Sequence, residues 1–150
     1  MDLQQHTQPR QLERYSFLWS QARLVIAAIA LFIGGTPPIY KLIPIPALFG
    51  LIGTFLTLCW IIAGLAAGYL LFRWFEGNQM LFGQKIPMDK VAFFVLVVSG
   101  INLGLAGILK KNIGMSLVNS YPIFIIVGLA YLVSAWYLRK RWLDNGGRIF

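Results

Sequence analysis

The amino-acid sequence predicts an all-α integral membrane protein with four transmembrane helices. Of its 150 residues, 58% are hydrophobic and only 12% are charged, whereas soluble domains are about 45–50% apolar and about 25% charged. A domain of this size buries only about 70% of the surface that its extended chain exposes, so it could not hide this excess of apolar side chains from water. The composition therefore excludes a water-soluble globule.

Four stretches of sequence are long enough to cross a bilayer, which takes about 20 mainly apolar residues in a helix. They are residues 24–43, 47–72, 91–109 and 121–138. The last two are rich in Val and Ile, but their unbroken apolar length indicates helices, because a membrane β-strand is shorter and alternates. Prolines at 37–38 are expected to kink the outer third of the first helix.

The basic residues indicate the orientation of these helices. Of the 13 Lys and Arg residues, only Lys41, Lys110 and Lys111 fall on one side, and the other ten fall on the opposite side. The positive-inside rule therefore predicts that both termini and the 73–90 loop are cytoplasmic, in a cell membrane that we expect to be a prokaryotic inner membrane. The first 14 residues are polar and no cleavage site follows the first apolar run, so we expect an uncleaved anchor.

An internal similarity predicts two helical hairpins. Residues 61–66 (IIAGLA) resemble residues 125–130 (IIVGLA), and each run is followed by a basic exit that contains tryptophan. Both hairpins start on the predicted cytoplasmic side, so the repeat is parallel; chance similarity between glycine-spaced apolar helices is the alternative. The expected organisation is a cytoplasmic or interfacial segment at 1–21, hairpins at 22–78 and 88–146, a cytoplasmic loop at 79–87 and a tail at 147–150.

The alignment of the two repeats also places Arg23. Arg23 aligns near Asp89 and Lys90, at the cytoplasmic edge of the second hairpin. We therefore expect Arg23 to lie at the membrane interface, outside the hydrocarbon. We expect Glu76 and Asp89 to be solvated charges that balance Arg73 and Lys90.

Small residues are expected to hold the helices together, because lipid offers no hydrophobic force between them and close approach of backbones must supply the attraction. Two interpretations stay open, namely packing inside one bundle and an interface between subunits of a homo-oligomer or a larger membrane complex. The candidates are Gly64, Gly68, Gly100, Gly104, Gly107, Gly128 and Ser134.

Asn102 is the most polar side chain within a predicted span. An amide in hydrocarbon needs a partner, and such bonds contribute about 0.6–2 kcal/mol. We expect it to bond to Ser134 or to a carbonyl freed by Pro37 and Pro38, as structural glue. The alternative is that Asn102 lines a narrow polar path.

The run Arg139, Lys140 and Arg141 directly follows the last predicted span. Such a cluster can bind anionic lipid headgroups, or it can be an ordinary stop-transfer flank. The positive charges are scattered along membrane flanks, so we do not expect nucleic-acid binding.

The sequence offers no catalytic set. No Asp, Glu, His, Lys or Arg lies at the centre of a predicted span, which argues against a proton-coupled transporter and an intramembrane protease. One cysteine, Cys59, and one histidine, His6, exclude an internal disulfide, a cysteine cluster and a multi-histidine metal site. We predict no catalytic residue, cofactor or metal.

Part of the chain resembles a known family. Residues 99–107 (SGINLGLAG) followed by residues 126–130 (IVGLA) are similar to motifs of the small bacterial membrane proteins of domain-of-unknown-function family 378, which are two-helix hairpins. The resemblance covers residues 90–136, and it departs from the family pattern at Leu103, where tryptophan is usual, and at Tyr131, where glycine is usual. It implies a fused tandem of such hairpins and supplies no function.

These observations predict a non-enzymatic structural or accessory subunit that assembles with itself or with a larger membrane complex, surrounded by membrane lipids. The alternative is a small channel or solute transporter with a polar path between the hairpins, near Asn102, Thr54, Thr57 and Ser134.

Overall fold

The computed structural model describes residues 8–117 and 120–150, which form helices and the loops between them. Among these residues, four helices are long and apolar enough to span a membrane, with Pro46–Leu48 adding a 3-10 turn to the start of the second. The prediction of an all-α protein with four helices long and apolar enough to span a membrane is therefore confirmed for the described residues. The elements in chain order are α2 (Pro9–Phe32), α3 (Ile39–Leu42), η1 (Pro46–Leu48), α4 (Phe49–Glu76), α5 (Pro87–Leu109), α6 (Ile113–Leu117) and α7 (Tyr121–Asp144).

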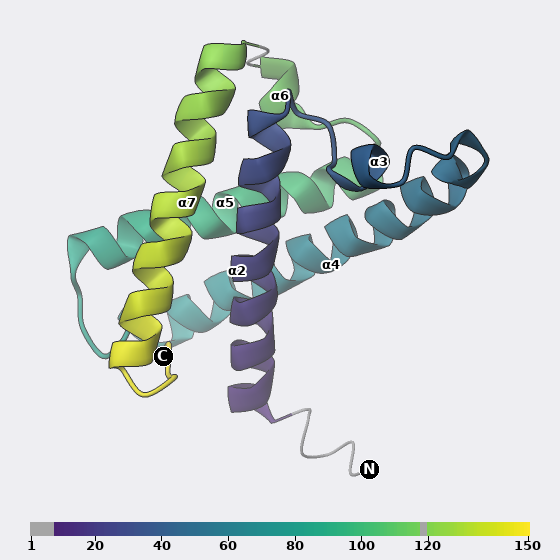
Figure 1. Cartoon of the computed structure of the whole chain (residues 1–150). Coiled ribbons are helices and arrows are strands. Elements are labelled where there is room, and N and C mark those ends of the chain that lie inside the picture. Colours follow the sequence, from purple (N-terminus) through teal and green to yellow (C-terminus); the bar gives the residue numbers. More distant parts are fainter. Residues whose placement is uncertain (1–7, 118–119) are drawn as a thin grey trace.

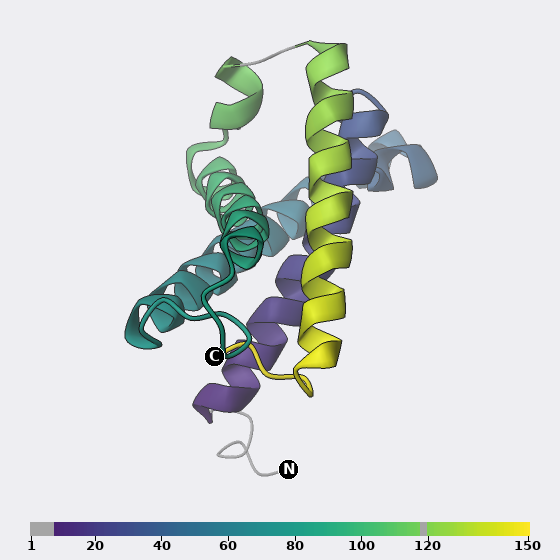
Figure 2. The same ribbon diagram turned by 90° about the vertical axis from the view of Figure 1, so that its left-hand side faces the viewer.

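The long helices pack as two crossing pairs. In Figure 1, α2 and α7 run side by side, while α4 and α5 pass across them. Figure 2 shows the same two pairs from the side. Half of the apolar part of α5 is buried within the chain, against 11% for α4. The centre of the bundle is therefore α5, and α4 leaves most of its surface to lipid or to another protein.

The first spanning helix differs from the predicted 24–43. It begins at Pro9, where proline suits the first turn because that turn has no use for its missing N–H, and it ends at Phe32. Gly34 and Gly35 have positive φ angles of 87° and 80°, and the Gly35 N–H closes the end by donating to the Ala30 carbonyl. Pro37 and Pro38 consequently lie in the connection to α3 and do not kink a helix.

The start of α2 also takes up much of the segment that was predicted as a separate N-terminal region at 1–21, of which residues 1–7 lie outside the described part. Among these polar residues, Glu13 and Gln21 are buried against the other helices. The predicted boundary followed hydropathy alone, which does not register polar side chains that are covered by protein.

The pairing of helices crosses the predicted hairpin boundary. The most extensive packing joins α4 to α5 and α2 to α7, and the helices within each predicted hairpin touch less. The start of α2 and the end of α7 lie at the same end of the molecule (Figures 1 and 2). The loop between α4 and α5 lies there too, because the Phe82 N–H donates to the Ile149 carbonyl at 2.7 Å.

Candidate functional site

The crossing of α4 and α5 depends on glycines. A Cβ on Gly104 would lie 2.6 Å from the Gly64 Cα, and one on Gly100 would lie 2.6 Å from the Ala67 Cβ. Both distances are shorter than carbon atoms allow, which is about 3.5 Å. Only glycine therefore permits the two backbones to approach this closely.

Two further predicted glycines also serve contacts inside the chain, and one does not. Gly107 of α5 faces Ile61 of α4, and Gly128 of α7 leaves room for the ring of Phe32 at the end of α2. A Cβ on Gly68 would have no atom within 4 Å. Ser134 is buried in α7. All the predicted glycines except Gly68 therefore serve packing between helices of this chain.

Arg23 is buried between helices, and it does not lie at the edge of the first helix, where the predicted range 24–43 placed it. Its side chain belongs to the middle of α2 and is only 7% exposed. Nη1 donates to the Ser99 hydroxyl and Nη2 to the Leu96 carbonyl, both at 2.8 Å. Leu96 and Ser99 are in the middle of α5, so the guanidinium joins the two helices near the middle of each.

The surroundings of Arg23 hold no opposite charge. Among the described residues, no ion pair to this guanidinium is formed, and its Nε and the nearby Ser20 hydroxyl make no hydrogen bond within the bundle. Gly100 makes room for it, since a Cβ there would lie 3.3 Å from Nη2. A charged group buried in this way is costly and commonly marks function in membrane proteins.

Sequence reasoning missed Arg23 because the first helix was placed too late in the chain. A helix over 24–43 has Arg23 at its edge, whereas a helix over 9–32 has it near the centre. The signal that could have found it is Pro9, because proline is a typical first residue of a helix.

Asn102 bonds to neither of its expected partners. Its Nδ2 donates to the Asn112 side-chain oxygen at 3.0 Å, and its Oδ1 accepts from the Gly114 N–H, also at 3.0 Å. Asn112 directly precedes α6, and Gly114 lies in the first turn of that helix. The amide of Asn102 therefore fixes the connection after α5.

Two ion-pair clusters lie at the end of the molecule where α2 begins and α7 ends. Arg73 of α4 pairs with Glu13 of α2 and with Glu76, each at 2.6 Å. Asp89 of α5 is fully buried and accepts from the Arg141 Nε at 3.0 Å and from the Tyr137 hydroxyl at 2.7 Å. The expectation that Asp89 is a solvated charge balancing Lys90 is therefore wrong.

The three basic residues that follow the last span make different contacts. Arg141 pairs with Asp89 and also donates to Gln84. Arg139 and Lys140 lie over the rings of Trp142 and Trp136, at 4.6 Å and 5.9 Å from the ring centres. The three residues are thus not equivalent as candidates for lipid headgroups.

A groove of about 400 Å³ runs along the first turns of α4. Its floor consists of small residues at spacings of three and four, which share one face of a helix. The two threonine hydroxyls bond to carbonyls of their own helix, and Lys110 donates to the Thr57 hydroxyl at 3.0 Å. The lining residues are Phe49, Gly50, Gly53, Thr54, Thr57, Leu58 and Lys110.

The described residues contain no group of three His, Cys, Asp or Glu side chains that could hold a metal ion. Cys59 is a half-buried free thiol on α4. Comparison with protein-family models, with curated proteins and with solved structures finds no match to this chain. Any function must therefore be argued from the geometry alone.

Proposed function

We propose that this chain is a non-enzymatic membrane protein that serves as a structural or accessory subunit, by assembling with itself or with a larger membrane complex. The observation that carries the proposal is the open groove on α4. Its small residues, Gly50, Gly53 and Thr54, would let the backbone of another transmembrane helix approach closely, and such approach is the main source of helix association in lipid.

The glycines elsewhere in the spanning helices support the choice of this groove, because most of them are already covered by other parts of the chain. Gly64, Gly100, Gly104 and Gly107 are covered by the α4–α5 crossing and Gly128 by Phe32. Among the glycines of the spanning helices, Gly50 and Gly68 have open space around them. Both are on α4, the spanning helix that the chain buries least.

The proposal includes the predicted topology, two parallel hairpins with both termini in the cytoplasm of a cell membrane. The helix ends expected to be cytoplasmic are the ends that bond to one another, through Glu13 with Arg73 and through Asp89 with Arg141. That arrangement supports an even number of spans with both termini on one side. The resemblance of residues 90–136 to the two-helix family supports the tandem repeat.

A leucine placed in the groove tests the assembly. Gly50→Leu meets no atom within 4 Å at its Cβ, so the fold should tolerate it while the groove is filled. The control is Ala130→Leu, which adds a leucine at an exposed small residue of α7, away from the groove. Native mass spectrometry in mild detergent should show a stoichiometric assembly for wild type and Ala130→Leu, and its loss in Gly50→Leu.

Cross-linking locates the contact. In a Cys59→Ala background, Thr54→Cys should cross-link to a neighbouring subunit in native membranes, whereas a cysteine in place of the exposed Ile126 of α7 should not. A clean monomer for the wild-type protein across several detergents and in membranes would refute the proposal.

A second candidate function, a small channel or solute transporter, is favoured by Arg23. The argument against ion-coupled chemistry required that no charged group lie at the centre of a span, and the guanidinium lies near the middle of α2 and α5. A path at Asn102 is less favoured, because its amide is bonded on both atoms. Liposome flux with wild type, Arg23→Met and Asn102→Leu tests this; flux that only Arg23→Met abolishes would support a path at Arg23, and no flux with any ion or solute would reject it.

A further inference from the structure

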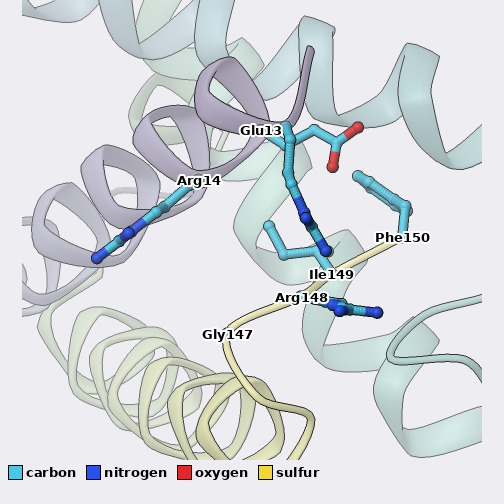
Figure 3. A pocket seen from close by; sticks show the side chains of 7 residues that line it. Glu13, Arg14, Gly147, Arg148, Ile149 and Phe150 are labelled. Carbon is cyan, nitrogen blue, oxygen red and sulfur yellow. The ribbon is translucent and has the colours of Figure 1, made fainter. Parts of the chain in front are cut away.

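A small hollow lies where the end of the chain folds back over the start of α2. Figure 3 shows Glu13 of α2 on one side and residues 147–150 on the other, while the Arg14 side chain extends away from residues 147–150. The enclosed part is about 20 Å³, which is enough for one water-sized oxygen atom. Arg10 completes the lining.

The C-terminal segment is fixed in this place by contacts with the rest of the fold. Ile149 is only 2% exposed, and its carbonyl accepts from the Phe82 N–H. The ring of Phe150 packs edge-on against Phe93 of α5, with 6.2 Å between ring centres. Arg148 is therefore held beside α2.

The charge around the hollow is strongly positive. Arg10, Arg14 and Arg148 are exposed, and no ion pair involves them among residues 8–117 and 120–150. Among the described residues that line the hollow, Glu13 has the only acidic side chain, and its Oε1 already accepts from Arg73 at 2.6 Å. The first turn of α2 has no acidic residue and its N-cap, Gln8, makes no side-chain cap, so the helix dipole adds to the positive potential.

We propose that this hollow binds the phosphate of an anionic phospholipid headgroup. Guanidinium groups match phosphate oxygens in paired hydrogen bonds. One phosphate oxygen would enter the enclosed part, and the rest of the phosphodiester would lie beside Arg10 and Arg148 at the surface.

The position in the fold favours a lipid over a free anion. The hollow lies at the ends of α2 and α7, and Trp136, Tyr137 and Trp142 lie in the last turns of α7. Tryptophan and tyrosine gather at headgroup level in membrane proteins, and basic pockets between helices at that level bind anionic lipids. This site differs from the run 139–141, where Arg141 is neutralised by Asp89.

The test is native mass spectrometry of the full chain in neutral detergent, titrated with phosphatidylglycerol or with phosphatidylcholine. The wild type should bind phosphatidylglycerol more tightly by about tenfold or more. The double variant Arg10→Gln, Arg148→Gln should lose about tenfold or more in that affinity, because each cation near an anionic lipid contributes about fivefold.

The matched control removes two other cations at the same end of the fold, through Lys85→Gln and Lys90→Gln. It should lose less than about threefold in affinity for phosphatidylglycerol. Equal loss in the two double variants would show diffuse attraction and overturn the site, as would equal binding of the two lipids. Binding of inorganic phosphate with no preference between the lipids would assign the hollow to a free anion and overturn the lipid proposal.

Discussion

Substituting Gly104 by alanine tests the close crossing of α4 and α5. The added methyl group would lie 2.6 Å from the Gly64 Cα and 3.2 Å from the Gly64 nitrogen. Carbon atoms pack at about 3.5–4.0 Å, so the two helices would have to separate by about 1 Å. Both atoms belong to helical backbone, so a side-chain rotation cannot relieve the overlap.

The size of the effect follows from two opposing contributions. Overpacking of this kind costs about 1–3 kcal/mol, and the upper part of the range is expected because the neighbour is rigid. Alanine is a better helix former than glycine by about 1 kcal/mol. We therefore expect Gly104→Ala to lower the free energy of unfolding by about 1–2 kcal/mol.

The matched control is Gly68→Ala, on the same helix as Gly64 but with no atom within 4 Å of the new methyl group. It should gain up to about 1 kcal/mol from helix propensity. Unfolding by SDS in mixed micelles, followed by the reactivity of the single thiol of Cys59, measures both variants. Equal stability of Gly104→Ala and Gly68→Ala would refute the close crossing.

Three further substitutions address the buried charges, and all can be measured by the same unfolding experiment. Arg23→Met loses two charge-assisted hydrogen bonds, about 1.5–3 kcal/mol each, but it also removes a charge whose burial costs several kcal/mol, so its stability should stay within about 1 kcal/mol of wild type. Ser99→Ala leaves the Arg23 Nη1 without its acceptor and should cost about 1–3 kcal/mol; a Ser99→Ala protein more stable than Arg23→Met would contradict this order. Asp89→Asn should cost about 2–3 kcal/mol, below the usual range for a broken buried pair because Arg141 is 22% exposed and reaches water; no change would show that the pair is not formed.

Composition and apolar length were sufficient to predict the four spanning helices. The prediction depends on a single strong requirement, that backbone polar groups in lipid bond within their own helix. The ends of the first helix were harder to predict. Gly34 and Gly35 end α2 through left-handed backbone conformations, and an apolar run that continues through to Ile43 hides that signal.

The polar contacts could not be predicted, because each one joins residues far apart in the sequence. Arg23 bonds to Ser99 across two helices, and Asp89 bonds to Arg141. A hydropathy profile scores such charged side chains as unfavourable in a membrane and carries no information about their hydrogen-bond partners. The groove on α4 was missed for a different reason, since its small residues are at the very start of a long apolar helix whose later glycines form the more obvious pattern.

The segment 99–107 makes its main contacts with helices outside its own predicted hairpin. Ser99 and Gly100 accommodate Arg23 of α2, and the contacts of Gly100, Gly104 and Gly107 come from α4. A hairpin made only of α5 and α7 would leave these glycines uncovered, and it would need a second hairpin to cover them. The tandem arrangement proposed for this chain supplies that second hairpin within one polypeptide, which explains how a glycine-rich helix such as α5 can be the buried centre of a monomer while α4 keeps a groove open for assembly.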